Sequence, residues 1–245
     1  MSLLQLEGVT KRFGGLTAVE DISLRVAAGE ILGLMGANGA GKTTLFAMIA
    51  GNLAPTSGRI LLEGRRIDGK GASTVNRLGI ARSFQIVRPF AGMSVLENVA
   101  AACLYGRRRL RSQTAARQEA LSILEGLGLG PVAARAAGTL TLAQRKRLEI
   151  ARALGTAPRI LLLDEVLAGL TAREVEDALD LLTEIRRSQD LTLVVIEHVM
   201  RALMRLSDRI VVLHHGALLA EGTPQSIAQD PRVAEVYFGE AAPHA

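Results

Sequence analysis

A short glycine-rich segment limits what this chain of 245 residues can fold into more than any other part of it. The segment reads Gly36-Ala37-Asn38-Gly39-Ala40-Gly41-Lys42-Thr43. An apolar run at residues 31–35 predicts a strand before it, and residues 42–50, which Gly51 ends, predict a helix after it. Glycines let the main chain curl inward, so that its amides and the helix N-terminus surround phosphate oxygens. The order strand, loop, helix therefore predicts a nucleotide site.

The side chains at the end of this loop fit the same chemistry. Lys42 can place a positive charge at the β and γ phosphates, Thr43 can offer its hydroxyl to Mg²⁺, and Thr44 can add a hydrogen bond to phosphate. A glycine-rich turn with an incidental lysine is the structural alternative, and the spacing with its flanking elements argues against it. Kinases, GTPases and motor ATPases all use such a loop, so the class of nucleotide-binding protein stays open at this point.

A pair of carboxylates, Asp164 and Glu165, follows a second apolar run at residues 160–163. Ligands of open parallel sheets bind at the carboxyl ends of the strands, where these acids stand. Asp164 is suited to hold Mg²⁺, and Glu165 is suited to polarise the water that attacks the γ phosphate. Capping of a surface turn is the alternative for either acid, and the presence of the phosphate loop favours the metal and catalytic roles.

Strand and helix patterns alternate along the chain. Apolar alternation predicts further strands at residues 3–9, 22–26, 59–62 and 191–196. Residues 94–154 are instead typical of successive helices, interrupted at Gly106, at 126–131 and at Gly138. Ser or Thr three positions before Glu or Gln predicts helix starts at Ser94, Thr141 and Thr171. We therefore expect an α/β fold in which a mainly parallel sheet is covered by helices on both faces.

Composition narrows the class of protein. Hydrophobic residues make up 49% and charged residues 22% of the chain, as in globular proteins. No apolar run approaches the roughly 20 residues that cross a bilayer, and no export signal opens the chain, so we expect it to be neither inserted nor exported. The single cysteine, Cys103, suits a reducing compartment. The net charge of +5 permits anionic partners, but the arginine cluster at 107–111 lacks interleaved aromatic residues, so nucleic-acid binding is not expected.

Taken in order, these motifs resemble those of the ATPase subunits of ABC transporters, and the resemblance covers nearly the whole chain. It implies that the cofactors are ATP and Mg²⁺ and that ATP hydrolysis is coupled to transmembrane transport. It also implies a P-loop NTPase cassette with a mainly parallel core sheet, an antiparallel β subdomain and an inserted helical subdomain. The expected arrangement is one ABC ATPase domain over residues 1–245, with a nucleotide-binding core at 1–90 and 158–245 and a helical subdomain at 91–157.

The resemblance implies further site residues. Phe13 falls where the family places an aromatic ring against adenine. Gln85 falls at the glutamine loop, whose side chain reaches the metal and its attacking water, and residues 86–93 would face the membrane subunit. His198 falls at the switch histidine, which hydrogen-bonds the γ phosphate. The structural alternatives are a core role for Phe13, an incidental glutamine and a structural histidine.

The family's signature motif is altered in this chain, where Leu140-Thr141-Leu142-Ala143-Gln144 stands in place of Leu-Ser-Gly-Gly-Gln. In the family this segment contacts the γ phosphate bound by a partner cassette, so Thr141, Ala143 and Gln144 are expected to contribute to nucleotide binding. Thr141 keeps the hydroxyl, whereas Ala143 puts a methyl group where the main chain should approach phosphate. The alternative is that Thr141 only caps its own helix. Thr171 also departs from the aspartate that is usual at its position.

The runs at residues 10–19, 147–152, 222–224 and 231–239 are similar to those of branched-chain amino-acid importer ATPases. This similarity implies uptake of hydrophobic amino acids or related small molecules at the cytoplasmic face of a bacterial cell membrane. The implied partners are membrane-spanning permease subunits, a second ATPase subunit and, indirectly, a periplasmic or extracellular binding protein. A heterodimer of cassettes is expected, and a homodimer is the alternative.

Other functions remain open from the sequence. A lipopolysaccharide-export cassette shares the amino-terminal run, but it usually has proline where Val166 stands. A non-transport ABC ATPase that acts on ribosomes or DNA usually carries two cassettes or long coiled-coil arms. A regulatory module that binds ATP without turnover is favoured only by the altered signature motif.

Overall fold

The computed structural model describes residues 2–83 and 89–238. The chain divides into two compact units: unit 1 comprises Met1–Gly71 and Thr192–Ala245, and unit 2 comprises Ala72–Leu191. The boundaries expected from the sequence, at 90/91 and 157/158, describe a different division, so the core and helical subdomains remain a prediction.

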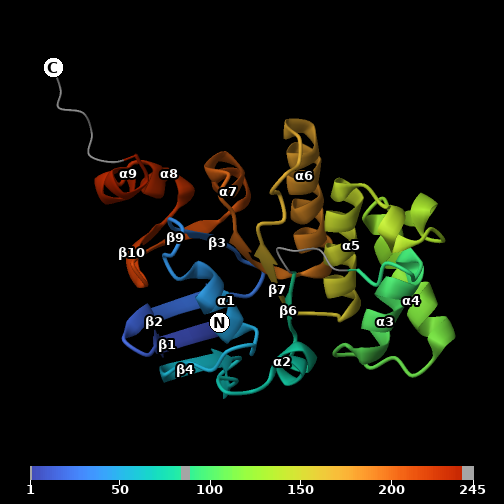
Figure 1. Cartoon of the computed structure of the whole chain (residues 1–245), viewed down its shortest axis with the longest axis horizontal. Helices are drawn as coiled ribbons and strands as arrows, with labels where there is room; N and C mark the ends of the chain where they lie inside the picture. Colours follow the sequence, from blue (N-terminus) through green and yellow to red (C-terminus); the bar gives the residue numbers. More distant parts are fainter. Residues whose placement is uncertain (1, 84–88, 239–245) are drawn as a thin grey trace. The chain divides into compact units, whose positions relative to one another are not determined.

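An antiparallel sheet in unit 1 has the strand order β2-β1-β4-β5, and Figure 1 shows β2, β1 and β4 side by side. The strands are β1 (Ser2–Phe13), β2 (Leu16–Ala27), β4 (Ser57–Leu62) and β5 (Arg65–Arg66). β1 and β2 form a hairpin in which Phe13 pairs with Leu16, and Gly14 supplies the φ of +57° in the turn. Both strands are longer than the apolar alternation predicts, because the exposed ends near the turn are held by pairing rather than by burial.

The remaining strands of unit 1 follow the order β10-β9-β3-β8. β8 (Thr192–Ile196) and β9 (Arg209–His214) run parallel to β3 (Ile31–Met35), and β10 (Ala217–Gly222) pairs antiparallel with β9. Every residue of β3 and β8 is buried, as expected for strands of a covered parallel sheet. The helices of this unit are α1 (Lys42–Ile49), α7 (Met200–Leu206), α8 (Pro224–Ala228) and α9 (Pro231–Phe238).

Gly33 lets helix α7 pack directly against the middle of β3. A Cβ atom at this position would lie 2.5 Å from Ser207 Oγ and 2.9 Å from Leu203 Cγ, so there is no room for a methyl group. This close approach explains why a glycine interrupts an otherwise apolar buried strand. Since α7 begins just after His198, its packing on β3 also fixes the chain that leaves β8.

Unit 2 contains a pair of parallel strands and several helices. β6 (Ile80–Arg82) pairs with β7 (Ile160–Asp164), and β7 is buried throughout. The helices are α2 (Ala72–Leu78), α3 (Val95–Tyr105), α4 (Gln113–Gly126), α5 (Leu142–Gly155) and α6 (Ala172–Gln189). Short 3₁₀ turns occupy Gly130–Val132 and Ala137–Thr139. Helices α3 and α5 pack closely at Gly155, where an added Cβ atom would lie only 3.1 Å from Ala102 Cβ.

Reciprocal capping boxes open α3, α5 and α6, as the sequence predicts. In each box the N-cap hydroxyl accepts a hydrogen bond from a main-chain amide of the first turn, and the Glu or Gln there accepts one from the N-cap amide. The pairs are Ser94 with Glu97, Thr141 with Gln144, and Thr171 with Glu174.

The predicted fold class is confirmed. Parallel strands, an antiparallel sheet and helices are all present, and they occur in the predicted order along the chain. None of the helices formed by residues 2–83 and 89–238 combines the length and the hydropathy of a membrane span.

Candidate functional site

The glycine-rich loop joins β3 to α1 and is pressed against neighbouring main chain in unit 1. Gly36 and Gly41 have φ angles of +155° and +98°. A Cβ atom on Gly36 would lie 2.6 Å from the carbonyl oxygen of Leu213, and one on Gly41 would lie 2.5 Å from that of Ala18. The path of the loop therefore requires glycine at both ends.

Lys42 lies beneath this loop with its side chain buried. Its Nζ donates hydrogen bonds to the carbonyl oxygens of Gly36, at 2.6 Å, and Ala37, at 3.0 Å. Helix α1 begins at Lys42 with neither a side-chain cap nor an acidic residue in its first turn. The first amides of a helix have no partner within that helix, so this end of α1 combines main-chain donors with an ammonium group and suits an anion.

The other predicted loop residues differ in exposure. Ala37, Asn38, Gly39 and Thr43 are exposed, Thr44 is half-buried and Ala40 is buried. The amide of Ala40 donates to the carbonyl oxygen of Ala37 at 3.1 Å, which closes the tight turn. The exposed members form the outer surface of the loop.

His198 lies at the same edge of the sheet as the phosphate loop. Leu34 of β3 and Ile196 of β8 are paired in parallel, and Gly36 and His198 each follow two residues later. Because parallel strands bring their carboxyl ends to one edge, both segments emerge together there. The His198 side chain is exposed. Unit 1 therefore gathers the loop, Lys42 and His198 at one edge.

Phe13 is the last residue of β1, and its side chain is 49% exposed. The Nζ atom of Lys11 lies 5.1 Å from the centroid of its ring. The ring is therefore not a core residue, and its exposure is compatible with the predicted stacking against a base.

Asp164 ends the buried strand β7 of unit 2, and its carboxylate is held from one side. Its Oδ2 accepts a hydrogen bond from the Arg82 guanidinium at 2.6 Å, and its amide donates to Ser83 Oγ at 3.2 Å. Its Oδ1 is buried and has no hydrogen-bond partner in the described part of the chain. A buried carboxylate oxygen without a donor is costly unless it meets a cation or water, so Asp164 fits the predicted metal role.

The surroundings of Asp164 favour one kind of metal. The described residues contain no group of three or more His, Cys, Asp or Glu side chains that could hold a metal ion by themselves. Mg²⁺ commonly binds through one or two protein oxygens, several waters and the phosphates of a substrate. The donor set around Asp164 therefore suits Mg²⁺ carried by a nucleotide better than a permanent metal centre.

Glu165 is half-buried and has a φ of +52°, which non-glycine residues rarely adopt. Its carbonyl oxygen accepts a hydrogen bond from Lys146 Nζ at 2.8 Å, and the Lys146 side chain is itself buried. Such a main-chain conformation costs about 1–2 kcal/mol and persists only where the surroundings hold it. Lys146 thus helps to fix the turn that aims the Glu165 side chain, a role that the sequence pattern does not reveal.

Thr141 caps α5, and this role leaves its hydroxyl proton available. Thr141 Oγ1 accepts a hydrogen bond from the Gln144 amide at 3.3 Å, and Gln144 Oε1 accepts one from the Thr141 amide at 3.1 Å. A hydroxyl that accepts one hydrogen bond can still donate another. Thr141 is exposed and Ala143 is half-buried. Capping and phosphate binding are therefore compatible at this helix end.

The remaining predicted positions fall outside these clusters. Thr171 is the N-cap of α6 and accepts a hydrogen bond from the Glu174 amide at 3.4 Å. Gln85 and the adjoining residues 84–88 lie outside the described residues, so the predicted glutamine loop remains a prediction.

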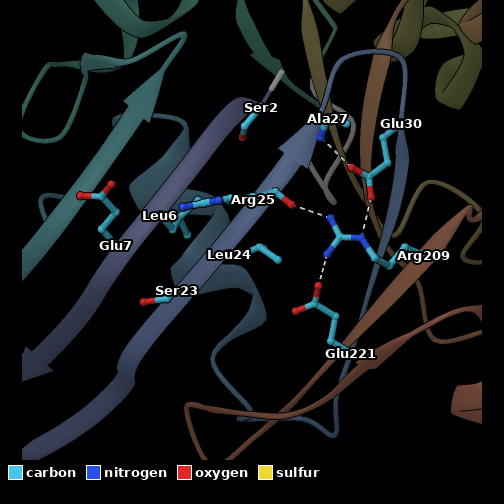
Figure 2. Close-up of a pocket in the computed structure, with 10 residues that line it drawn as sticks. All are labelled: Ser2, Leu6, Glu7, Ser23, Leu24, Arg25, Ala27, Glu30, Arg209 and Glu221. Atoms are coloured by element: carbon cyan, nitrogen blue, oxygen red, sulfur yellow. Dashed lines mark hydrogen bonds and ion pairs between the residues drawn. The ribbon is translucent and has the colours of Figure 1, made fainter.

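A pocket of about 920 Å³ in unit 1 is lined in part by Glu30, Arg209 and Glu221 (Figure 2). It lies at the opposite end of β3 from the phosphate loop. Arg209 donates to Glu30 Oε1 at 2.7 Å and also to Glu221 and the carbonyl oxygen of Arg25. Glu30 directly precedes β3, whereas the phosphate loop follows it. These contacts join β2, β3, β9 and β10, and we therefore interpret this charged cluster as structural rather than as a ligand site.

Comparison with known proteins gives consistent matches over almost the entire chain. Residues 19–168 match the family model described as "ABC transporter", and residues 217–243 match one described as "Branched-chain amino acid ATP-binding cassette transporter". The high-affinity branched-chain amino acid transport ATP-binding protein BraF of Pseudomonas aeruginosa is 41% identical, with 98% of each chain covered. Its counterpart LivG of Escherichia coli is 40% identical over the same shares. Among solved structures, the ADP conformation of MJ1267, an ATP-binding cassette of an ABC transporter, is 31% identical and has a TM-score of 0.88, covering 98% of this chain and 100% of that one.

Proposed function

This chain belongs to the ABC transporter family of ATP-binding cassettes, and from that premise we propose that it hydrolyses ATP to drive uptake of branched-chain amino acids or related small molecules. The observation that carries this proposal is the glycine loop with a buried lysine beneath it and an uncapped helix behind it. A loop of this kind binds the phosphates of a nucleotide. The names of the relatives, which are amino-acid transport ATP-binding proteins, supply the direction toward amino acids.

We assign roles to individual residues from their chemistry and from the family resemblance. Lys42, the loop amides and His198 contact the phosphates, and Phe13 stacks on adenine. Thr43, Asp164 and Gln85 would hold Mg²⁺, which when bound would neutralise charge on the phosphates. The carboxylate of Glu165 accepts a proton from the attacking water. Thr141 and Gln144 serve the nucleotide of a second cassette, and the methyl group of Ala143 weakens that contact.

In this proposal, other subunits form the membrane passage and select the substrate. We propose that it works beneath membrane-spanning permease subunits at the cytoplasmic face of the membrane, with a second ATPase subunit of a different sequence. A binding protein outside the membrane would select the substrate and would not touch this chain. The lipopolysaccharide-export and non-transport alternatives are not favoured, since BraF and LivG both match over 98% of the chain.

Nucleotide binding is tested most directly by replacing Lys42. Lys42→Ala should weaken ATP binding by about 10-fold to 100-fold, because a hydrogen bond to a charged group contributes about 1.5–3 kcal/mol. Isothermal calorimetry on purified protein measures this change. Lys70→Ala removes an exposed lysine of the same unit and should leave the affinity as it is. Parent protein that binds no ATP at millimolar concentration would refute the proposal.

A further inference from the structure

The carboxylate of Asp164 is paired with a guanidinium inside unit 2. Arg82 and Asp164 lie 2.6 Å apart, and their side chains are 12% and 2% exposed. The pairing follows from the strand register. Arg82 on β6 is opposite Leu162 on β7, and Asp164 lies two residues further along, on the same face of its strand. The side chains therefore meet as diagonal neighbours across the two strands.

A buried ion pair of this kind needs an explanation, because it is an expensive way to stabilise a protein. Removing two charges from water costs several kcal/mol per ion, and their attraction only partly offsets that cost. An apolar pair of similar volume would serve packing equally well. The carboxylate itself, however, has a second use as the proposed metal ligand, which an apolar side chain would not supply.

Arg82 occupies only one of the two carboxylate oxygens. It holds Oδ2, while Oδ1 is buried and lacks a hydrogen-bond partner among the described residues. The guanidinium thus compensates the charge of Asp164 and leaves one oxygen for a cation or its water. Two positive charges near one carboxylate repel each other, so Arg82 must also lower the affinity of this site for Mg²⁺.

We propose that Arg82 is a positioning residue that acts as a built-in counter-ion for Asp164. It holds one oxygen of the carboxylate and lowers the affinity of the other for a cation, which keeps metal binding reversible. This inference rests on the proposed function, because it names Asp164 as the residue that meets Mg²⁺. The role of Arg82 on β6 is then to adjust the affinity of Asp164 for Mg²⁺, and not only to pack against β7.

Two measurements with opposite expected signs test this inference. Arg82→Met should lower the thermal unfolding midpoint without metal by about 10 °C, because it leaves a buried carboxylate unpaired. The same change should tighten the binding of Mn²⁺, used as a paramagnetic substitute for Mg²⁺, to the ATP-loaded protein by about 10-fold. Electron paramagnetic resonance measures free and bound Mn²⁺ without any turnover. A merely structural residue would lower stability without tightening metal binding.

Matched variants complete the experiment. Arg82→Lys retains a cation and should shift the Mn²⁺ affinity by less than about threefold. In an Asp164→Asn background, Arg82→Met should cost less than half as much in unfolding midpoint, since no charge is left behind. If Arg82→Met does not fold, its recovery by Asp164→Asn supports the inference, and failure to recover overturns it.

Unchanged or weaker Mn²⁺ binding in Arg82→Met would also overturn the counter-ion role. An equal loss of stability in both Asp164 backgrounds would do the same. If the parent protein binds ATP and Mn²⁺ normally and these results still appear, only the role of Arg82 fails. If the parent protein binds neither, the proposed function fails first, while the unfolding experiment still reports on the ion pair.

Discussion

At the scale of single residues, the site depends on positions where the main chain leaves no choice of side chain or holds an unusual conformation. Gly36 and Gly41 lie against carbonyl oxygens, and Glu165 has a positive φ. Unusual conformations of this kind are retained where the surrounding structure holds them, and they concentrate at functional sites. Within unit 2, Arg82 donates a hydrogen bond to the Asp164 carboxylate, and Lys146 donates one to the Glu165 carbonyl oxygen.

Alanine substitutions at two loop glycines distinguish the loss of stability caused by a steric clash from that caused by a strained φ. Gly41→Ala should lower the free energy of unfolding by about 2–4 kcal/mol, because the new methyl group would meet the Ala18 carbonyl oxygen at 2.5 Å while φ is +98°. At Gly39 φ is also positive, +82°, but nothing lies within 4 Å of the Cβ position. Gly39→Ala should therefore lower the free energy of unfolding by only about 1 kcal/mol. Urea unfolding of both variants measures the difference. Equal losses would show that the Ala18 contact does not constrain the loop.

At the scale of helices and strands, the elements with strong local signals could be predicted from the sequence. The apolar runs gave β3, β7 and β8, and the capping boxes gave the starts of α3, α5 and α6. Strand β6 has only the three residues Ile80–Arg82 and exists because it pairs with β7, a partner far away in the sequence. The contact of Arg82 with Asp164 depends on that same long-range pairing, and the contact of Lys146 with Glu165 joins helix α5 to the end of β7, so no local pattern reveals either of them.

The capping boxes should make the helix ends respond differently to acid. Hydrogen bonds from the main-chain amide and hydroxyl of the N-cap residue hold the pKa of Glu97 and of Glu174 below the ordinary value of 4.5. A carboxyl whose pKa is lower in the folded state adds stability above its unfolded pKa, and this stability is lost as the pH falls through the folded pKa. The starts of α3 and α6 should therefore weaken below about pH 4.5, whereas the Gln144 box of α5 should not.

Substitutions at these positions provide the measurement. The double change Glu97→Gln and Glu174→Gln should flatten the acid side of a plot of unfolding midpoint against pH. Gln144→Glu should instead make that side steeper, because it adds a titrating box to α5. A parent-like acid profile in the double variant would show that these carboxylates do not contribute to the pH dependence.

At the scale of the whole molecule, the proposed function joins ATP hydrolysis to transport by other subunits. Cells in which Glu165→Gln replaces the parent chain should lose at least about 90% of labelled leucine uptake, because removal of a general base slows its step by about 10²-fold to 10⁴-fold. Uptake of lysine in the same cells serves as the control and should not change. Normal leucine uptake, with the variant present at parental levels, would contradict the coupling of this ATPase to branched-chain amino acids.

The close packing of α7 on Gly33 limits which substitutions this protein can accept during evolution. A single extra carbon there would push Ser207 and Leu203 outward and displace the helix that begins just after His198. A change distant from every phosphate contact could thus disable the cassette by moving its histidine. Surveys of loss-of-function variants should therefore include Gly33, although it lies outside the phosphate loop.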